Sequence, residues 1–247
     1  MKTSVDLNAD LGEGAASESE LLRLVSSANI ACGFHAGDPA SITRSIRAAH
    51  QARVAIGAHP SLADRENFGR RELPVASEEV FALVTYQVGA FRAIANSLGA
   101  EPRHVKPHGA LYNMAARDPS LAGAVVRAIA AVDRSLLLFA PGGSALARAG
   151  EELGLQVTRE VFADRNYLPD GSLVPRTRPD ALLHDAAEAG TRVLRMLREE
   201  LVRAVDGRDI PIAADTICVH GDTPESVAFA RQLRENLAAA GVAVAAP

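Results

Sequence analysis

Acids, imidazoles and one ammonium group recur directly after short apolar segments of this sequence. Lys106 and His108 lie at the end of one segment in the string HVKPHGALYN, and His59 follows another in AIGAHPS. Side chains of these types can bind an anion, transfer protons or hold a metal ion. The other members of this set are Asp6, Asn8, Asp10, Glu13, Cys32, His35, Gly142-Gly143-Ser144, Glu160, Asp164, Arg165, His220 and Asp222.

The segments that precede these residues are predicted to be β-strands. Longer amphipathic stretches, typical of helices, separate them along the chain. Repeated strand–helix units favour a mostly parallel sheet with right-handed crossovers. Because the carboxyl ends of parallel strands meet on one face, the polar side chains are expected to converge there. The seven predicted strands are residues 4–7, 28–32, 54–58, 104–106, 136–139, 156–162 and 216–219.

Local signals predict where several helices begin and end. Ser17 with Glu20 predicts a capping box at the start of the first helix. A long amphipathic pattern predicts a helix from about Asp185 to Val205. An N-cap side chain followed by proline, which favours a helix start, occurs at Asp38-Pro39, Asp118-Pro119 and Thr223-Pro224.

Two connections are too long to be simple strand-to-helix joins. Residues 61–76 and 163–185 both follow a predicted strand and are rich in Arg, Asp and Gly. Within the second, Pro169-Asp170-Gly171 predicts a turn between two short extended segments. Both connections are expected to act as lids or binding loops.

Composition limits the classes of protein to which the chain can belong. With 247 residues, 48% hydrophobic and 23% charged, it is predicted to form one globular α/β domain over 1–247. A net charge of −4 with scattered basic residues argues against nucleic acid as a partner and favours a small ligand. No apolar run suits a membrane span, and the N-terminus does not resemble a secretory signal. Two cysteines, Cys32 and Cys218, favour a reducing cytoplasm.

Simpler structural roles account for some of these side chains. Asp38 and Asp118 are explained as helix caps, and His50 and His104 as solvated or packed. Lys106 is different, because a lysine buried at the end of a barrel strand needs an anion or carboxylate partner. The sequence contains neither an H-E-x-x-H pair nor a phosphate-binding G-x-x-x-x-G-K-[ST] loop.

Six groups of motifs occur in one order between Val5 and Pro224. They are VDLNADLGEG, SANIACGFHAGDP, AIGAHPS with DRENFGRREL, HVKPHGALYN, EVFADRNY with PDGSLVPR, and ADTICVHGDTP. Together they resemble the LamB/YcsF family, the A subunits of prokaryotic 5-oxoprolinase. The resemblance implies a TIM-like (β/α) barrel, incomplete with seven parallel strands and related to the glycoside hydrolase and deacetylase barrels. It also implies ATP-dependent opening of 5-oxo-L-proline to L-glutamate, with B and C subunits as partners.

The resemblance further implies which residues form the site. After LGEG the family usually has a longer loop with an acidic element, whereas here 14–17 lead at once into the predicted helix, so contacts from that loop are not carried over. Asp38 and Asp222 also lie in the motifs. The residues implied to be catalytic are Asp6, Asn8, Glu13, Lys106, His108, Glu160, Asp164, Arg165 and His220. Those implied to bind substrate are His35, His59, Arg65, Asn67, Arg70 and Asn113.

A mechanism follows from these residue types as a hypothesis. Lys106, Arg165 and Arg70 are expected to neutralise the substrate carboxylate or a phosphorylated carbonyl oxygen. His108 or His220 would activate water or protonate the leaving ring nitrogen. The carboxylates expected to orient these groups, or to act as the base, are Asp6, Glu160 and Asp164.

Two alternatives stay open beside this reading. Asp10, His35 and His59 supply oxygen and nitrogen ligands from three strands and could hold a divalent metal, as a metal-dependent amide or sugar N-deacetylase would require. The chain could also be a non-catalytic component that presents substrate to a partner. A bound zinc ion and activity without ATP would favour the metal-dependent deacetylase. Wild-type activity of the complex after mutation of strand-end residues would favour the non-catalytic component.

Overall fold

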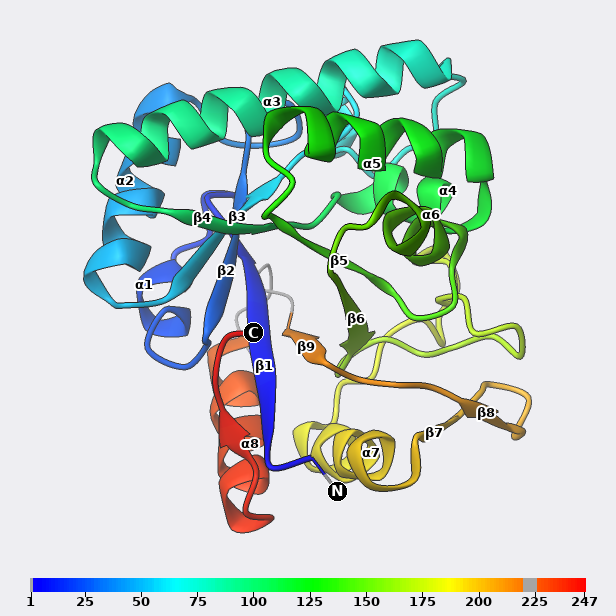
Figure 1. The fold of residues 1–247 in the computed structure, drawn as a ribbon. Helices are drawn as coiled ribbons and strands as arrows, with labels where there is room; N and C mark the ends of the chain where they lie inside the picture. Colours follow the sequence, from blue (N-terminus) through cyan, green and yellow to red (C-terminus); the bar gives the residue numbers. More distant parts are fainter. Residues whose placement is uncertain (1, 220–225) are drawn as a thin grey trace.

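A closed ring of seven parallel strands forms the centre of the molecule (Figure 1). The structure, a computed structural model, describes residues 2–219 and 226–247. Pairing of the last strand of the ring, β9, with the first, β1, closes the barrel. The prediction of a seven-stranded TIM-like barrel is therefore confirmed. In ring order the strands are β1 (Ser4–Leu11), β2 (Ser27–Ala31), β3 (Ala55–His59), β4 (Pro102–Val105), β5 (Leu137–Pro141), β6 (Val157–Phe162) and β9 (Thr216–Val219).

Helices cover the outside of the ring, as the alternation of strands and helices predicts. Helices α3 (Ser77–Ser97) and α5 (Pro119–Val132) pack together across one side (Figure 1). Helices α7 (Ala186–Glu199) and α8 (Ser226–Ala239) pack together on another. A short strand, β10 (Ala243–Val244), pairs in parallel with Ser4 and Val5 at the start of β1. Strand β7 (Leu201–Arg203) pairs antiparallel with β8 (Asp209–Pro211). The helices are α1 (Glu18–Leu21), α2 (Pro39–Gln51), the 3-10 turn η1 (Arg65–Asn67), α3 (Ser77–Ser97), α4 (Gly109–Arg117), α5 (Pro119–Val132), α6 (Ala145–Leu153), α7 (Ala186–Glu199) and α8 (Ser226–Ala239).

Strand β1 shows how the barrel separates its apolar and polar side chains. Leu7 and Leu11 belong to the hydrophobic core between the ring and the helices. The alternate residues Asp6, Asn8 and Asp10 bond instead to side chains of neighbouring strands within the ring. Because side chains alternate along a strand, burying Leu7 and Leu11 on one face fixes the three polar residues on the other.

His104 is packed inside the barrel, as one of the two structural readings of this residue expects. Its ring stacks on Phe139 with centroids 4.2 Å apart, and its Nε2 bonds to Asn29 Oδ1 at 2.8 Å. The neighbouring strand makes room for the ring at Gly57, where an added Cβ would lie 2.2 Å from the imidazole. The register between β3 and β4 shifts at this point.

Helix α7 is shorter than predicted: it ends at Glu199 and not near Val205. Glu200 adopts a left-handed conformation with φ of 55°, and the chain then forms the β7–β8 hairpin around Gly207. The sequence signal for this hairpin is Asp206-Gly207, a dipeptide that favours tight turns. The apolar residues beyond 199 have helical spacing, which is why the sequence predicts a longer helix. In the structure this segment is strand β7, and Val202 is its buried residue.

The predicted capping box at Ser17 and Glu20 is wrong. Helix α1 is a single turn, and Ser17 is itself in a helical conformation with no side-chain cap hydrogen bond. The carboxylate of Glu18 accepts instead from the N–H groups of Glu13 and Gly14, each at 2.9 Å. By contrast, Asp38 and Asp118 cap α2 and α5 as predicted. Thr223-Pro224 lies outside the described residues.

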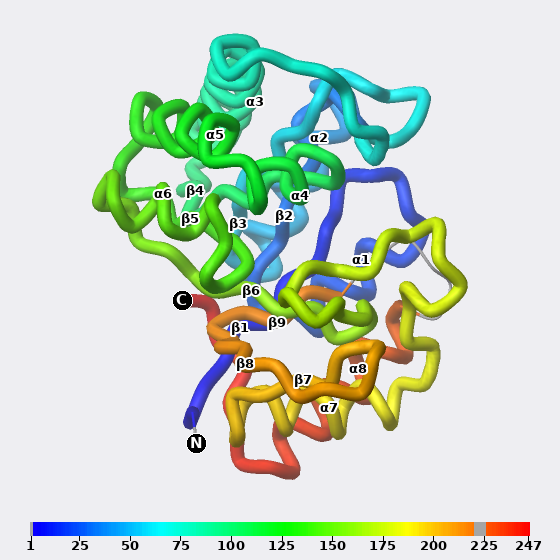
Figure 2. The backbone as a smooth tube through the Cα atoms, turned by 90° about the vertical axis from the view of Figure 1, so that its right-hand side faces the viewer, coloured from blue at the N-terminus to red at the C-terminus, as the bar shows by residue number. Residues whose placement is uncertain are grey.

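The two long connections, 61–76 and 163–185, lie at the end of the barrel away from the chain termini (Figure 2). The predicted turn in the second connection forms at Gly171, between the bridged residues Tyr167 and Leu173. Because β1–β6 and β9 are parallel, this is the end at which their carboxyl termini meet.

Asp215 forms ion pairs with Arg159 and Lys2 at the opposite end of the barrel. It accepts two hydrogen bonds from the Arg159 guanidinium, at 2.6 and 2.9 Å, and one from the Lys2 ammonium. Burial opposes ionisation of this carboxyl, but the two cations outweigh it and hold its pKa well below the usual range.

Asp215→Asn should therefore lower the free energy of unfolding at pH 7 by about 1–2 kcal/mol, after allowing for the exposure of Arg159. A carboxyl with a depressed pKa stabilises the fold above about pH 4, and this contribution disappears as the pH falls. Urea unfolding of both proteins between pH 7 and 3 checks the expectation. A difference that stays constant over this range would contradict it.

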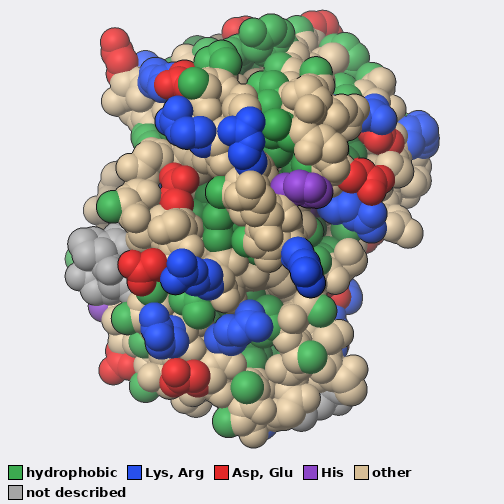
Figure 3. Space-filling view, turned by 90° about the vertical axis from the view of Figure 1, so that its left-hand side faces the viewer, with side chains coloured by type: hydrophobic (Ala, Val, Ile, Leu, Met, Phe, Trp, Pro, Cys, Tyr) green, Lys and Arg blue, Asp and Glu red, His purple; other side chains and the backbone are tan. Residues whose placement is uncertain are grey.

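The described surface mixes positive and negative charge. On the face shown in Figure 3, Lys and Arg side chains lie among Asp and Glu. Within 2–219 and 226–247, no helix combines the length and the apolar character needed to cross a bilayer.

Candidate functional site

Lys106 is the centre of a buried ionic network at the carboxyl end of the barrel. It follows directly after β4, and its Nζ lies 2.9 Å from both Asp10 Oδ1 and Glu160 Oε1. The same ammonium is 3.0 Å from Cys218 Sγ and 3.3 Å from Asn8 Oδ1. Burial alone would lower the pKa of Lys106, but the adjacent carboxylates raise it well above its ordinary value. Lys106 thus has the carboxylate partners that its burial requires.

Further side chains fix the two carboxylates of this network. Tyr112 on α4 donates to Glu160 Oε2 at 2.7 Å, and Asn8 donates to Glu160 Oε1 at 3.0 Å. Asn29 donates to Asp10 Oδ1 at 2.9 Å. These donors hold the anionic oxygens in place around the ammonium group.

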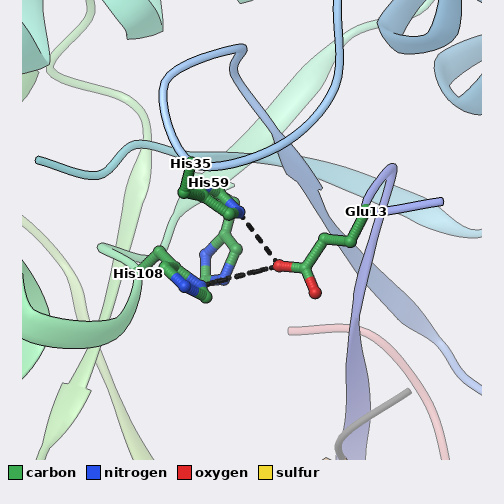
Figure 4. A group of neighbouring side chains, drawn as sticks. All are labelled: Glu13, His35, His59 and His108. Carbon is green, nitrogen blue, oxygen red and sulfur yellow. Dashed lines mark hydrogen bonds and ion pairs between the residues drawn. The ribbon is translucent and has the colours of Figure 1, made fainter. Parts of the chain in front are cut away.

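A second cluster, formed by Glu13, His35, His59 and His108, adjoins the Lys106 network (Figure 4). One ligand atom from each residue lies within 4.8 Å of the others. The four residues come from β3 and from the segments that follow β1, β2 and β4, so the barrel alone brings them together. Asp10 links the two groups: its Oδ1 binds Lys106, and its Oδ2 lies 3.4 Å from His59 Nε2.

The predicted metal set of Asp10, His35 and His59 differs from the group of possible ligands that the structure brings together. Among the described residues, the group that could hold a metal ion contains both of these histidines, but its carboxylate is Glu13 and its third imidazole is His108. Asp10 is turned to Lys106 through the oxygen that also accepts from Asn29.

Two histidines of this cluster, His35 and His108, have lowered pKa values. Burial is the main cause: it lowers the pKa of His35 to about 2 and that of His108 well below its ordinary value. The two rings stack with centroids 3.8 Å apart and planes 3° from parallel. Burial therefore opposes the imidazolium form of both rings, and the role of His108 as a proton donor stays a prediction.

The connection 61–76 lies directly over the histidines. His108 Nε2 is 2.9 Å from the carbonyl oxygen of Phe68, and the next residue, Gly69, has a left-handed φ of 64°. A Cβ added to Gly69 would lie 2.9 Å from His35 Cβ and 3.1 Å from His108 Cδ2. Only glycine allows the loop to approach the rings so closely.

Gly69→Ala should displace the loop from the rings and lower turnover by at least about tenfold, with about 1–3 kcal/mol of lost stability from the strained backbone. Gly171→Ala is the matched control, because Gly171 also has positive φ but has nothing within 4 Å of an added Cβ. Steady-state kinetics and urea unfolding of the two variants compare contact with backbone strain. Equal loss of turnover in both would contradict a specific role for Gly69.

The other residues expected in the site divide into several groups. Asp6 lies further down the ring and accepts from Ser26, Ser27 and Thr216, and burial raises its pKa. Arg165 is buried at the end of β6 and donates to the carbonyl oxygens of Val174 and Ala181, next to Asp164 in the chain. His220 and Asp222 lie outside the described residues.

The predicted substrate-binding residues outside the histidine cluster have other partners. Arg65 donates to the carbonyl oxygens of Gly33 and Gly37, and so ties η1 to the segment after β2. Asn67 donates to Asp64, and the Arg70 guanidinium lies over the Phe68 ring at 4.8 Å. Asn113 is exposed on α4. Arg65 and Arg70 are nevertheless close enough to His35 for their positive charges to help lower its pKa.

Three residues of the site are missing from the predicted set: Asn29, Tyr112 and Cys218. Each is buried against the Lys106 network, yet none lies in a polar run of the sequence. One signal in the sequence could have indicated Tyr112. In the motif ALYN it directly precedes Asn113, the residue that was predicted to bind substrate.

Comparison with known proteins identifies the family of this chain. The LamB/YcsF family model matches residues 5–247. A lactam utilization protein from Thermus thermophilus is 44% identical, with a TM-score of 0.92 over 99% of this chain and 100% of that one. A family 4 carbohydrate esterase from Streptomyces lividans (11% identity, TM-score 0.53, 98% and 91% coverage) shares only the fold. So does a putative cellobiose-phosphate cleavage protein from Enterococcus faecalis (14%, 0.58, 99% and 97%). The chain belongs to the LamB/YcsF family.

Proposed function

We propose that this chain is the A subunit of an ATP-dependent 5-oxoprolinase, which opens the lactam of 5-oxo-L-proline to L-glutamate together with B and C subunits. Membership of the LamB/YcsF family and the 44% identical lactam utilization protein support the substrate class. The observation that carries the proposal is the buried Lys106 ammonium, paired with Asp10 and Glu160 beside three histidines.

Amide resonance makes the lactam a poor electrophile, so the reaction needs activation at the carbonyl. In the proposed reaction the carbonyl oxygen takes the terminal phosphoryl group of ATP and ADP leaves. Water then adds to the carbonyl carbon, and the ring C–N bond breaks to leave an acyl phosphate. A second water hydrolyses this acyl phosphate to the carboxylate and phosphate. The sum is 5-oxoproline, ATP and two waters giving glutamate, ADP and phosphate.

Lys106 and Asp10 are the residues best placed to assist this chemistry. The buried Lys106 Nζ supplies positive charge to the oxygen on which negative charge develops. Asp10 Oδ1 is occupied by Lys106 and Asn29, whereas Oδ2 faces the histidine cluster. Oδ2 therefore takes the proton from the attacking water and passes it to the ring nitrogen as the C–N bond breaks.

The proposal is tested by combining the chain with its B and C partners and measuring glutamate and ADP formed from 5-oxo-L-proline. Glutamate and ADP should form in equal amounts and should both be lost when Asp10→Asn or Lys106→Met replaces the wild-type chain. Asp206→Asn is the control, because Asp206 is an exposed residue in the β7–β8 turn and is not part of the site. Wild-type turnover in both site variants would overturn the catalytic proposal, and would favour a chain that only binds substrate.

A second function, amide or sugar N-deacetylation assisted by a metal ion, has one supporting observation: the cluster of Glu13 with three histidines. It predicts hydrolysis without ATP. Release of acetate from N-acetylated sugars by the isolated chain, without nucleotide, would favour this second function over the first.

A further inference from the structure

The cluster of Glu13, His35, His59 and His108 contains more electron-pair donors than it has hydrogens to share. His59 Nδ1 lies 2.6 Å from the carbonyl oxygen of Lys106, and His108 Nε2 lies 2.9 Å from that of Phe68. A carbonyl oxygen only accepts, so these two nitrogens carry the ring hydrogens. With one hydrogen of each ring donated to a carbonyl oxygen, His59 Nε2 and His108 Nδ1 are the nitrogens left to act as ligand atoms.

The two remaining nitrogens face each other. His59 Nε2 and His108 Nδ1 are 2.9 Å apart, a separation at which two acceptors repel unless a cation lies between or beside them. Glu13 Oε1, which is also only an acceptor when ionised, lies 3.6 Å from His108 Nδ1 and 3.9 Å from His59 Nε2. His35 Nε2 adds a further nitrogen 3.0 Å from the same oxygen.

We propose that this cluster binds one divalent transition-metal ion of the zinc class, with His35 Nε2, His59 Nε2, His108 Nδ1 and Glu13 Oε1 as its ligand atoms. The binding site stands on the geometry alone, whereas a role for the ion in lactam opening rests on the proposed function. The assignment replaces Asp10, the carboxylate expected from the sequence, with Glu13.

The distances suit such an ion. Two ligands each about 2.0–2.1 Å from one zinc ion lie roughly 2.9–3.4 Å apart, for ligand angles from about 90° to tetrahedral. The separation of His59 Nε2 and His108 Nδ1, 2.9 Å, falls in this range. The distances from Glu13 Oε1 to the three nitrogens, 3.0, 3.6 and 3.9 Å, bracket the tetrahedral value.

The donor set also indicates which ion is preferred. Three imidazole nitrogens and one carboxylate favour zinc and similar late transition metals over Mg²⁺ or Ca²⁺, which prefer oxygen ligands. Backbone carbonyls that fix the hydrogens of His59 and His108 act as the outer hydrogen-bond partners that orient metal-binding histidines. When bound, such an ion polarises the carbonyl group of an amide. Asp10 Oδ2 lies 3.4 Å from His59 Nε2, and Oδ1 of the same carboxylate binds Lys106, so both residues adjoin the cluster.

The experiment is zinc binding by the tag-free full-length chain after removal of metal with a chelator. Titration calorimetry with ZnCl₂ should show one site per chain, and His59→Ala or His108→Ala should weaken it by more than about 100-fold, since loss of an outer partner alone costs about 10–100-fold. Glu13→Gln, which preserves the shape of the side chain, should weaken binding by at least about tenfold. The double variant His50→Ala/His184→Ala removes two histidines outside the cluster and should bind as wild type.

Two measurements on the wild-type chain keep the proposal testable if the histidine variants do not fold. X-ray absorption of the zinc-loaded protein should show nitrogen and oxygen ligands with imidazole scattering and no sulfur, and Co²⁺ should give the intense visible bands of a four-coordinate site. The proposal is overturned if zinc does not bind stoichiometrically or if the absorption spectrum shows sulfur ligands. It is also overturned if binding is lost only in the His50/His184 variant, since that result would show an adventitious ion only. These binding measurements contain no substrate. Zinc binding can therefore be confirmed even if the chain does not take part in 5-oxoproline turnover.

Discussion

Replacement of Lys106 by Met should abolish turnover and lower the free energy of unfolding by about 3–5 kcal/mol, the cost of leaving a buried charge without its partner. The ammonium lies 2.9 Å from both Asp10 and Glu160, and the side chains of all three residues are at least nine-tenths buried. Methionine fills similar space but leaves the two carboxylates facing each other. Urea unfolding followed by circular dichroism measures the stability, and ATP-coupled glutamate formation measures the activity.

Two further variants separate charge from packing. Glu160→Gln removes one of the carboxylates, so Lys106→Met combined with Glu160→Gln should be less destabilised than the sum of the single variants. The chain has one other lysine, Lys2, which pairs with the half-buried Asp215 at the opposite end of the barrel. Lys2→Met should retain turnover. Full activity in Lys106→Met, or strictly additive losses of stability, would contradict the role assigned to this network.

Asp10→Asn should reduce kcat by about 10²–10⁴-fold, the range associated with loss of a general acid–base group, while the protein stays folded. The amide oxygen of asparagine can still accept from Lys106 and Asn29, so the packing around Oδ1 is preserved. The other atom of the group, however, can no longer take a proton from water. Single-turnover measurements of lactam opening, with the thermal unfolding midpoint as a check on folding, test this expectation.

The exposed turn at Asp206 supplies the control, because Asp206→Asn also exchanges a carboxylate for an amide. A loss confined to KM in Asp10→Asn would show that the carboxylate only helps to bind substrate. Unchanged kcat would remove Asp10 as the proton acceptor.

Much of the barrel could be predicted because its strands are short apolar runs at regular intervals. The seven strands occur where the sequence predicts them, and polar side chains that end β1, β3 and β4 meet at one end of the ring. This convergence follows from parallel pairing and needs no knowledge of side-chain conformation. The same reasoning could not show that α7 ends at Glu199, because the apolar spacing continues into β7.

The partners inside the site could not be predicted from strand positions alone. Asp10 lies 3.4 Å from His59, but Glu13 also lies close to His35 and His108. The chain turns after β1 through Gly12 and Gly14, both with positive φ, and so carries Glu13 to these rings. Hydrogen bonds from the backbone of Glu13 and Gly14 to Glu18 hold this turn. Such a turn depends on contacts between loop residues that leave no periodic pattern in the sequence.

Tyr112 shows the same limit on a helix. Its hydroxyl bonds to Glu160, whereas the neighbouring Asn113, which the motif suggested, is exposed. A shift of one residue on α4 turns a side chain by about 100°, so motif position alone does not decide which of two neighbours faces the barrel.

A crystal structure of the chain with 5-oxo-L-proline bound would locate the reacting lactam. The lactam carbonyl oxygen is expected within hydrogen-bond distance of Lys106 Nζ, with the ring nitrogen near Asp10 Oδ2 and the ring beside His59. Lactam bound on another face of the molecule, with the Lys106–Asp10–Glu160 contacts unchanged and no substrate at the carboxyl end of the barrel, would contradict the account.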